Sequence, residues 1–260
     1  MLNRNFINRW VIKICRYIFR QKFLPVMAGP LKGYLWTTSS SYEYILGYYE
    51  DPEMMKQFLS WFKKDTVYYD IGANIGFHAL AGNRVMQQGK IYAFEPIPLV
   101  RQLFEKHISL NSKLMIHNNI ELLPFAISDS EKQVEFSNSA IQKEGNTYIK
   151  ESPVFSGTAD KITVQCFAID GLLEKGYEKP DIIKIDVEGA EFDVLQGSVN
   201  TLKKYKPNIL LATHEYHLPG VRDKCISFLQ DLGYNLKHKG DHNKQVDGID
   251  DYIAIHPGRI

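Results

Sequence analysis

The sequence has few cysteines, no long hydrophobic run and almost no excess of charge. Its 260 residues include three cysteines, Cys15, Cys166 and Cys225, which lie far apart and form no Cys-x-x-Cys pair. This spacing argues against a zinc site or a disulfide framework and favours reduced, buried thiols in a cytoplasmic protein. With 31 Lys and Arg against 30 Asp and Glu, the formal net charge is +1. The chain therefore has no general basic field for binding nucleic acid.

Basic residues interrupt every apolar run near the N-terminus. Residues 1–24 contain six Lys or Arg side chains, no acid, and apolar residues at helical spacing. The charges exclude a signal peptide and a transmembrane helix. Two interpretations stay open for this segment. It is either a basic amphipathic helix on an anionic membrane surface, or a helix that covers the domain with its basic side in water.

An aromatic segment follows and leads into a second predicted helix. Leu31 to Tyr49 is rich in Tyr, and Pro52 begins a helix over residues 53–62 that has an acid in its first turn. Residues 1–64 are therefore predicted to form an N-terminal helical and aromatic cap that packs over a ligand cleft of the domain formed by residues 65–260. Glu50 is either a ligand contact in that cleft or an acid at the start of the helix.

The chain is organised around the stretch from Val67 to Leu80. An apolar run over residues 67–71 predicts a buried strand, the turn Gly72-Ala73-Asn74-Ile75-Gly76 follows, and good helix-forming residues come next. A glycine turn of this kind lets the backbone approach a ligand closely, and the helix after it offers free N–H groups. The spacing of the glycines matches neither G-x-G-x-x-G nor the Walker pattern, so the standard phosphate sites do not fit.

An acidic residue ends the next predicted strand. The strand over residues 90–94 runs into Glu95-Pro96, about twenty residues after the glycine turn. In α/β folds, an acid at the tip of the second strand accepts hydrogen bonds from ribose hydroxyls. Strand, turn, helix, strand and acid therefore occur in the order of a nucleoside-binding unit.

Strands and helices alternate along the rest of the chain. Further strands are expected over residues 120–127, 180–186 and 207–213, with helices over 76–87, 97–110, 191–203 and 221–232 and a terminal hairpin of 234–238 with 252–256. The polar segment 137–160 is expected to be a mobile insertion or lid. This alternation predicts a mostly parallel sheet with helices on both faces and a ligand site beyond the carboxyl ends of the strands. Polar residues follow those strands, namely Asp70, Glu95, Ser128, Asp186 and His214.

Three motifs resemble those of the FkbM-type methyltransferases, which use S-adenosylmethionine. They run from Asp70 to Gly76, from Tyr92 to Pro96 and from Asp181 to Glu191, and the likeness extends from about Tyr42 to about Tyr234. The resemblance implies the α/β, Rossmann-like fold of class I methyltransferases. That fold has a seven-stranded sheet, parallel except for one strand of the C-terminal antiparallel hairpin, with helices on both faces.

The resemblance also implies a set of cofactor contacts. The glycine turn would wrap the methionine part of the cofactor, Glu95 would hold both ribose hydroxyls, and the end of the third strand would flank the adenine. Two positions depart from the family pattern, because His78 replaces a small hydroxyl or aromatic residue and Ala212 stands where many members have an acid nearby. The expected cofactor-binding residues are Asp70, Gly72, Ala73, Asn74, Gly76, Glu95, Pro96, Ala126, Ser128, Asp129 and Asp186.

Three residues are candidates for catalysis. Methyl transfer to an alcohol needs a group that takes the hydroxyl proton. His214 is the best base by its ordinary pKa, and Asp186 would orient it or act in its place. Glu188 completes the set or pairs with a helix dipole. Mg²⁺ held by Asp186 with Glu188 or Glu215 is an alternative.

Two other side chains near these candidates have simpler interpretations. His217 is expected to be a surface residue, and Lys184 is expected to pair with an acid inside its strand.

The sequence therefore predicts an S-adenosylmethionine-dependent O-methyltransferase that acts on a sugar hydroxyl in a glycan, glycolipid or secondary metabolite. The alternatives are a methyltransferase acting on nitrogen or a small metabolite, and a non-catalytic cofactor-binding scaffold. The expected partners are a small-molecule or glycan acceptor and, through residues 1–24, a membrane surface. The expected location is the cytoplasm, with peripheral contact to a membrane. The acceptor and the oligomeric state do not follow from the sequence.

Overall fold

The structure is a computed structural model that describes residues 22–115, 117–137, 161–241 and 248–259. The predictions for Cys15, for the basic helix and for the lid therefore lie wholly or largely outside the described residues. Cys166 and Cys225 are buried free thiols, as the sequence predicts.

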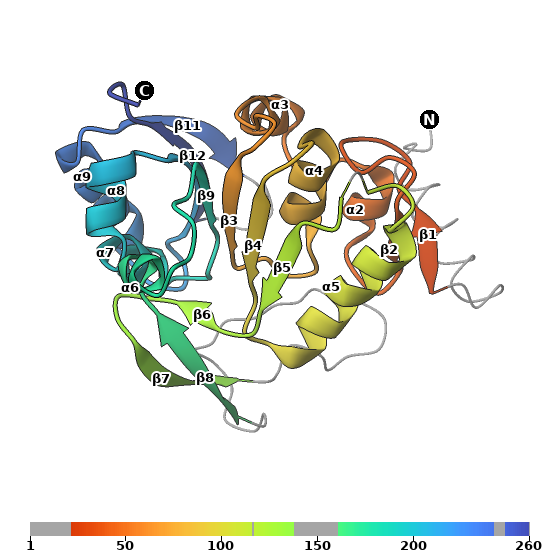
Figure 1. The fold of residues 1–260 in the computed structure, drawn as a ribbon, viewed down its shortest axis with the longest axis horizontal. Helices are drawn as coiled ribbons and strands as arrows, with labels where there is room; N and C mark the ends of the chain where they lie inside the picture. The colour runs from red at the N-terminus through yellow and green to blue at the C-terminus, as the bar shows by residue number, and fades with distance from the viewer. Residues whose placement is uncertain (1–21, 116, 138–160, 242–247, 260) are drawn as a thin grey trace.

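A seven-stranded sheet forms the centre of the molecule (Figure 1). Every neighbouring pair in it is parallel except those that β12 makes with β10 and β11. This confirms the predicted class I fold with one antiparallel strand in the terminal hairpin. The strands, in spatial order, are β11 (Asn235–Asp241), β12 (Ile249–Ile255), β10 (Asn208–His214), β9 (Ile182–Ile185), β3 (Val67–Ile71), β4 (Lys90–Phe94) and β5 (Ile120–Leu123).

Helices cover both faces of this sheet, and successive side chains of a strand enter opposite layers. Tyr68 packs into the core under the first layer, whereas Tyr69 packs into the core under the second. The first layer contains α3 (Pro52–Ser60), α4 (Phe77–Val85) and α5 (Pro98–Asn111). The second contains α6 (Ile169–Glu174), α7 (Glu191–Gln196), α8 (Val199–Tyr205) and α9 (Val221–Asp231).

The N-terminal segment packs beside the first layer as β1 (Phe23–Pro25), β2 (Leu35–Thr37) and α2 (Tyr42–Leu46). The prediction of a helix up to residue 24 is wrong at its end, because Phe23 and Leu24 pair with β2. Asn111 of α5 fixes β2 by hydrogen bonds to both the N–H and the carbonyl of Leu35. Asp51 caps α3 by accepting a hydrogen bond from the N–H of Met54 at 2.7 Å.

The predicted strand over residues 120–127 is also wrong, because it is two strands in two sheets. β5 ends at Leu123, and Pro124 has no N–H with which to continue the ladder. β6 (Ala126–Ile127) instead joins a small sheet with β7 (Lys132–Ser137) and β8 (Lys161–Phe167), below the main sheet in Figure 1. Residues after β6 therefore do not lie at the tip of a main-sheet strand.

The helix predicted over residues 191–203 is interrupted between α7 and α8. Gly197 lies against another part of the backbone, and an added Cβ there would stand 2.1 Å from the carbonyl oxygen of Ser128. The carboxylate of Asp170 then accepts hydrogen bonds from the N–H groups of Asn200 and Thr201, which starts α8 as a separate helix.

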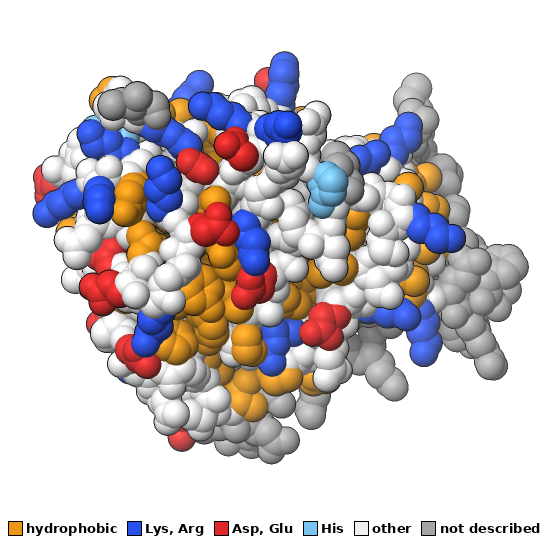
Figure 2. Space-filling view, viewed as in Figure 1, with side chains coloured by type: hydrophobic (Ala, Val, Ile, Leu, Met, Phe, Trp, Pro, Cys, Tyr) orange, Lys and Arg blue, Asp and Glu red, His pale blue; other side chains and the backbone are white. Residues whose placement is uncertain are grey.

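The described surface agrees with the composition. On the face shown in Figure 2, side chains of both charges are interspersed, so this face has no continuous basic patch among its described residues. In the described ranges, no helix combines the length and the apolar character that a membrane crossing needs.

Candidate active site

The glycine turn brings the ends of β3 and β9 into direct contact. Gly72 and Gly76 have φ angles of 74° and 95°, and Asn74 between them has 49°. An added Cβ on Gly72 would lie 1.9 Å from the carbonyl oxygen of Asp186. Only glycine fits at that position, and the two strand ends that are expected to face the cofactor are held together there.

Glu95 sits at the tip of β4 and faces this turn. It is buried, and its carboxylate accepts hydrogen bonds from the N–H groups of Asn74 (3.0 Å) and Ile97 (2.9 Å). Burial raises the pKa of Glu95 to about 7, although these two hydrogen bonds oppose the shift. Arg101 holds the backbone here by donating to the carbonyls of Glu95 and Pro96. Each carboxylate oxygen has a further lone pair for a ligand hydroxyl.

The segment expected to flank the adenine follows β5 but belongs to another sheet. Ala126 belongs to β6, and Ser128 bonds through its N–H to the carbonyl of Phe167. The carboxylate of Asp129 is held by Lys132 and the hydroxyls of Ser128 and Ser130. The contact of Ala126, Ser128 and Asp129 with the cofactor, which the family resemblance implies, therefore stays a prediction.

Lys184 of β9 links two carboxylates beneath the glycine turn. Its buried ammonium lies 3.5 Å from Asp70 and 3.3 Å from Asp186, and it donates a hydrogen bond to the carbonyl of Gly72 at 2.8 Å. Burial lowers the pKa of Lys184, but the charges of Asp186 and Asp70 more than offset this and leave it raised. The expected pairing of Lys184 with an acid is therefore present, and the cation stabilises the ionised form of Asp186.

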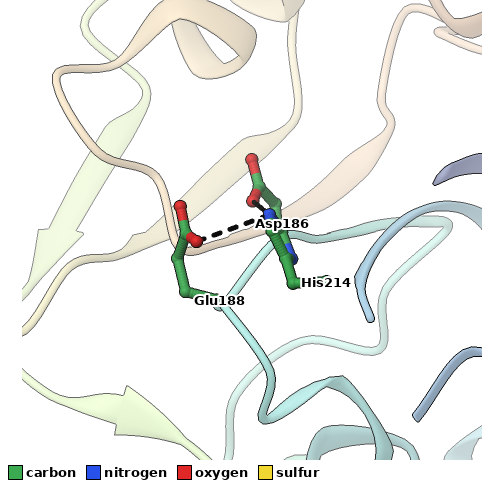
Figure 3. Close-up of side chains that lie close together, drawn as sticks. All are labelled: Asp186, Glu188 and His214. Carbon is green, nitrogen blue, oxygen red and sulfur yellow. Dashed lines mark ion pairs between the residues drawn. The ribbon is translucent and has the colours of Figure 1, made fainter. Parts of the chain in front are cut away.

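Asp186, Glu188 and His214 converge beyond β9 and β10 (Figure 3). The Nε2 atom of His214 lies 3.5 Å from Asp186 and 3.6 Å from Glu188. His214 is buried, whereas the side chains of Asp186 and Glu188 are 31% and 34% exposed. The three predicted catalytic residues thus form one cluster whose carboxylates are open to a ligand.

Glu191 is a further member of this cluster that the sequence reasoning missed. Its fully buried carboxylate accepts a hydrogen bond from the N–H of Gly189 and lies 2.6 Å from Nδ1 of His214. Burial lowers the pKa of His214, but the bond to Glu191 and the charges of Glu188 and Asp186 outweigh it and raise that pKa to about 9. An imidazolium has no lone pair to accept a proton, so this environment argues against His214 as the base, and its catalytic role stays a prediction.

The environment of Glu188 suits a proton acceptor. Its backbone φ is 55°, in the left-handed region, which is uncommon for a non-glycine residue and typical of functional sites. Partial burial raises its pKa to about 7, although the charge of His214 opposes the shift. His217 approaches Glu188 at 2.8 Å with a side chain only 9% exposed, so the expectation of a surface histidine is wrong.

Asp186, Glu188 and His214 have ligand atoms close enough to surround a cation. These atoms all lie within 4.8 Å of one another, and two of the three residues offer the carboxylate oxygens that Mg²⁺ prefers. Glu215 is not available, because its carboxylate accepts hydrogen bonds from the N–H groups of Gly220 and Arg222 at the start of α9. Mg²⁺ held by Asp186 and Glu188 therefore stays a prediction.

Glu50 is turned into the protein and does not cap α3, since Asp51 does so. Its carboxylate lies 3.2 Å from Nε2 of His78, in the first turn of α4. The cap therefore supplies a buried acid next to the glycine turn, which the sequence left as one of two interpretations.

Comparison with known proteins places this site in a family. The model of the methyltransferase FkbM domain matches residues 70–236. The methyltransferase sdnD of Sordaria araneosa is 28% identical over 196 residues, covering 64% of this chain and 73% of that protein. The hexuronic acid methyltransferase AglP of Haloferax volcanii is 29% identical over 154 residues, 59% of this chain and 58% of AglP. The 2-O-methyltransferase NoeI of Sinorhizobium fredii is 26% identical over 151 residues, 55% of this chain and 61% of NoeI.

A solved structure shares the fold. The crystal structure of methyltransferase FkbM from Methylobacillus flagellatus superimposes with a TM-score of 0.53 and 15% identity over 74% of this chain and 44% of that one. At this identity the likeness shows the fold alone. The family match covers more than half of the chain. It includes the glycine turn, Glu95 and the acid–imidazole cluster of Asp186, Glu188, His214 and Glu191. The chain therefore belongs to the FkbM methyltransferase domain family and is an S-adenosylmethionine-dependent methyltransferase.

Proposed function

We propose that this chain transfers the methyl group to a hydroxyl of a sugar. The acid–imidazole cluster of Asp186, Glu188, His214 and Glu191 carries this proposal. A sugar hydroxyl is a weak acid, so its methylation needs a group that removes a proton beside the donor. Glu188, whose pKa is raised to about 7, is matched to that task at neutral pH. The names of AglP and NoeI, a hexuronic acid methyltransferase and a 2-O-methyltransferase, support a sugar hydroxyl as the acceptor.

The residues present fit the cofactor. S-adenosylmethionine supplies an electrophilic methyl group on a positively charged sulfur. Around the ends of β3, β9 and β10 the described residues gather four carboxylates, of Asp70, Asp186, Glu188 and Glu191, against the two cationic groups of Lys184 and His214. This excess of negative charge favours a cationic ligand. Glu95 offers buried acceptor atoms for the ribose hydroxyls.

Each member of the cluster has a distinct role in the proposal. Glu188 accepts the proton of the acceptor hydroxyl, and its side chain reaches solvent, so it can release that proton after the reaction. Asp186, held by Lys184, presents a negative charge to the cationic donor. His214 stays protonated and keeps the two carboxylates together, while Glu191 fixes the orientation of its ring.

The product of the reaction tests the proposal. Purified protein is incubated with methyl-labelled S-adenosylmethionine and, separately, the methyl glycosides of glucuronic acid, glucose and rhamnose. Transfer of label to a hydroxyl oxygen of one of them, located by mass spectrometry and NMR, is the expected result. Labelling only of a set of amine acceptors included in the same panel would contradict it, as would binding of the cofactor without turnover on any acceptor.

Binding of the demethylated cofactor is expected to depend on the charge of Glu95. Ribose hydroxyls donate to the carboxylate, and protonation removes an acceptor position. With a free-protein pKa of about 7, the Kd of S-adenosylhomocysteine should rise about tenfold between pH 8 and pH 6. Glu95→Gln should bind at least about tenfold more weakly at pH 8 and lose much of this pH dependence. Isothermal titration calorimetry measures both effects.

The matched control for this prediction is Glu121→Gln. Glu121 lies on the neighbouring strand β5 and forms a surface pair with Lys90. This variant should bind S-adenosylhomocysteine like the wild type at each pH. Equal affinity of Glu95→Gln and wild type at pH 8 would remove Glu95 from the cofactor site.

A further inference from the structure

We propose that the buried pair of Glu50 and His78 recognises the amino-acid end of S-adenosylmethionine. In this assignment Glu50 accepts hydrogen bonds from the α-ammonium group, and His78 donates a hydrogen bond to the α-carboxylate. The inference rests on the proposed use of the glycine turn as the cofactor site, and it adds a residue from the N-terminal cap to that site.

The pair is attached to the turn on one side and to the cap on the other. His78 lies two residues after Gly76, in the first turn of α4, and Glu50 lies between α2 and α3. Their facing atoms, Nε2 of His78 and Oε1 of Glu50, are 3.2 Å apart, and the two side chains are 8% and 2% exposed. Nothing in the periodicity of α3 or α4 requires an acid and an imidazole at these two positions.

The environment of His78 leaves its polar atom unsatisfied. The ring is surrounded by the aromatic side chains of Phe58 and Phe77, both in edge-to-face contact. Within the described part of the chain, the buried Nε2 atom makes no hydrogen bond, although the carboxylate of Glu50 lies 3.2 Å from it. A buried polar atom without a hydrogen bond is costly and calls for an explanation. A ligand acceptor at this nitrogen would satisfy it.

The cap next to Glu50 packs against the residue that follows the glycine turn. The rings of Tyr44 and Tyr49 stack on each other, and both lie against the ring of Phe77, at 5.5 and 5.4 Å between centroids. The charge of Glu50 contributes to raising the pKa of Lys184, and both Glu50 and Asp186 contribute to raising that of Tyr44 and Tyr49. Burial is the larger cause for the two tyrosines, whereas for Lys184 burial acts in the opposite direction. The charges of Glu50 and Asp186 therefore act on the same side chains. An acid with an adjacent imidazole, next to the glycine turn, complements a zwitterion that carries one ammonium and one carboxylate group.

Three adenosine ligands separate the two contacts. S-adenosylhomocysteine carries both charged groups, its decarboxylated form carries only the ammonium, and 5′-methylthioadenosine carries neither. In Glu50→Gln, the Kd should rise at least about tenfold for the first two ligands and stay within about twofold for the third. In His78→Phe, the new ring takes the place of the imidazole between Phe58 and Phe77. Only the Kd of S-adenosylhomocysteine should rise by that factor in this variant. Isothermal titration calorimetry at pH 7 measures all nine affinities, including those of the wild type.

The control is Asp170→Asn, which makes the same carboxylate-to-amide change away from the turn. Asp170 lies in α6 and accepts hydrogen bonds from the N–H groups at the start of α8. The variant's ratio of affinities for S-adenosylhomocysteine and methylthioadenosine should equal that of the wild type. Equal weakening of all three ligands in Glu50→Gln and His78→Phe, or no weakening in either, would overturn the inference. If Glu50→Gln does not fold, as judged by circular dichroism, His78→Phe decides alone. A wild type that binds none of the three overturns the cofactor site itself.

Discussion

Glu188→Gln is expected to lower kcat for methyl transfer about a thousandfold and to change the Kd of S-adenosylhomocysteine less than about threefold. The substitution keeps the shape of the side chain but removes its capacity to accept a proton. Glu188 lies 3.6 Å from His214 and 2.8 Å from His217, and it is reached from solvent. The loss should therefore fall on the chemical step and not on cofactor binding. Initial rates at saturating acceptor, with calorimetry for binding, separate the two.

The pH dependence of the wild type should be bell-shaped. Activity needs the ionised form of Glu188, so kcat/KM should rise with pH up to the pKa of about 7. It also needs the imidazolium of His214, so kcat/KM should fall as pH passes the pKa of about 9. This quantity reports on the free enzyme, which is the state that these pKa values describe. When kcat/KM is measured for the acceptor at a cofactor concentration that saturates the enzyme at every pH, so that the titration of Glu95 does not contribute, Glu188→Gln should lose the acidic limb of the profile.

Glu191→Gln gives an independent check of the alkaline limb. Glu191 raises the pKa of His214 through a hydrogen bond of 2.6 Å, so neutralising it should move that limb to lower pH. The matched control is Glu215→Gln, because Glu215 follows His214 directly yet caps α9. Its profile should match the wild type. An acidic limb that persists in Glu188→Gln would assign the base to another group.

The main sheet was predictable because its signals are local. Val67–Ile71 and Lys90–Phe94 are short apolar runs bounded by turn residues or acids, and the structure has strands with those bounds. The break after β5 was also within reach of the sequence, because Pro124 cannot donate to a ladder. By contrast, β2 depends on Asn111, which lies 76 residues away from Leu35. No local pattern predicts a strand that a distant side chain stabilises.

The candidate site was predictable in position but not in protonation. The convergence of Asp186, Glu188 and His214 followed from their places after parallel strands. The protonation of His214 depends on Glu191, which is 23 residues away in the chain. In the sequence, Glu191 looks like an ordinary acid in the first turn of α7. An ordinary pKa therefore made His214 the best base, and three neighbouring carboxylates reverse that choice. The only signal available in the sequence was the short spacing between Glu188 and Glu191, an acid just before α7 and one in its first turn.

Gly72→Ala is expected to destabilise this protein strongly. Two costs combine at this position. The left-handed φ of 74° is unfavourable for alanine, and the new Cβ would lie 1.9 Å from the carbonyl oxygen of Asp186. That neighbour is backbone at the end of a central strand, so it moves only if β3 and β9 separate. The free energy of unfolding should fall by about 4 kcal/mol.

Separation of β3 from β9 would also dismantle the proposed site. The carbonyl of Gly72 accepts a hydrogen bond from Lys184, which in turn lies 3.3 Å from Asp186. Movement of the turn therefore displaces the carboxylate of Asp186, which is expected to face the donor. It also displaces the N–H of Asn74, which donates a hydrogen bond to Glu95. We expect no measurable binding of S-adenosylhomocysteine by Gly72→Ala, even at temperatures where the variant is folded.

Gly176→Ala is the matched control that separates the two costs. Gly176 has a φ of 94°, and an added Cβ there would meet nothing within 4 Å. This variant should lose only about 1–2 kcal/mol of stability, from the backbone conformation, and should bind S-adenosylhomocysteine normally. Urea denaturation and calorimetry on both variants give the comparison. Equal destabilisation of the two, with cofactor binding retained in Gly72→Ala, would show that the close contact between the glycine turn and Asp186 is not what holds the donor site together.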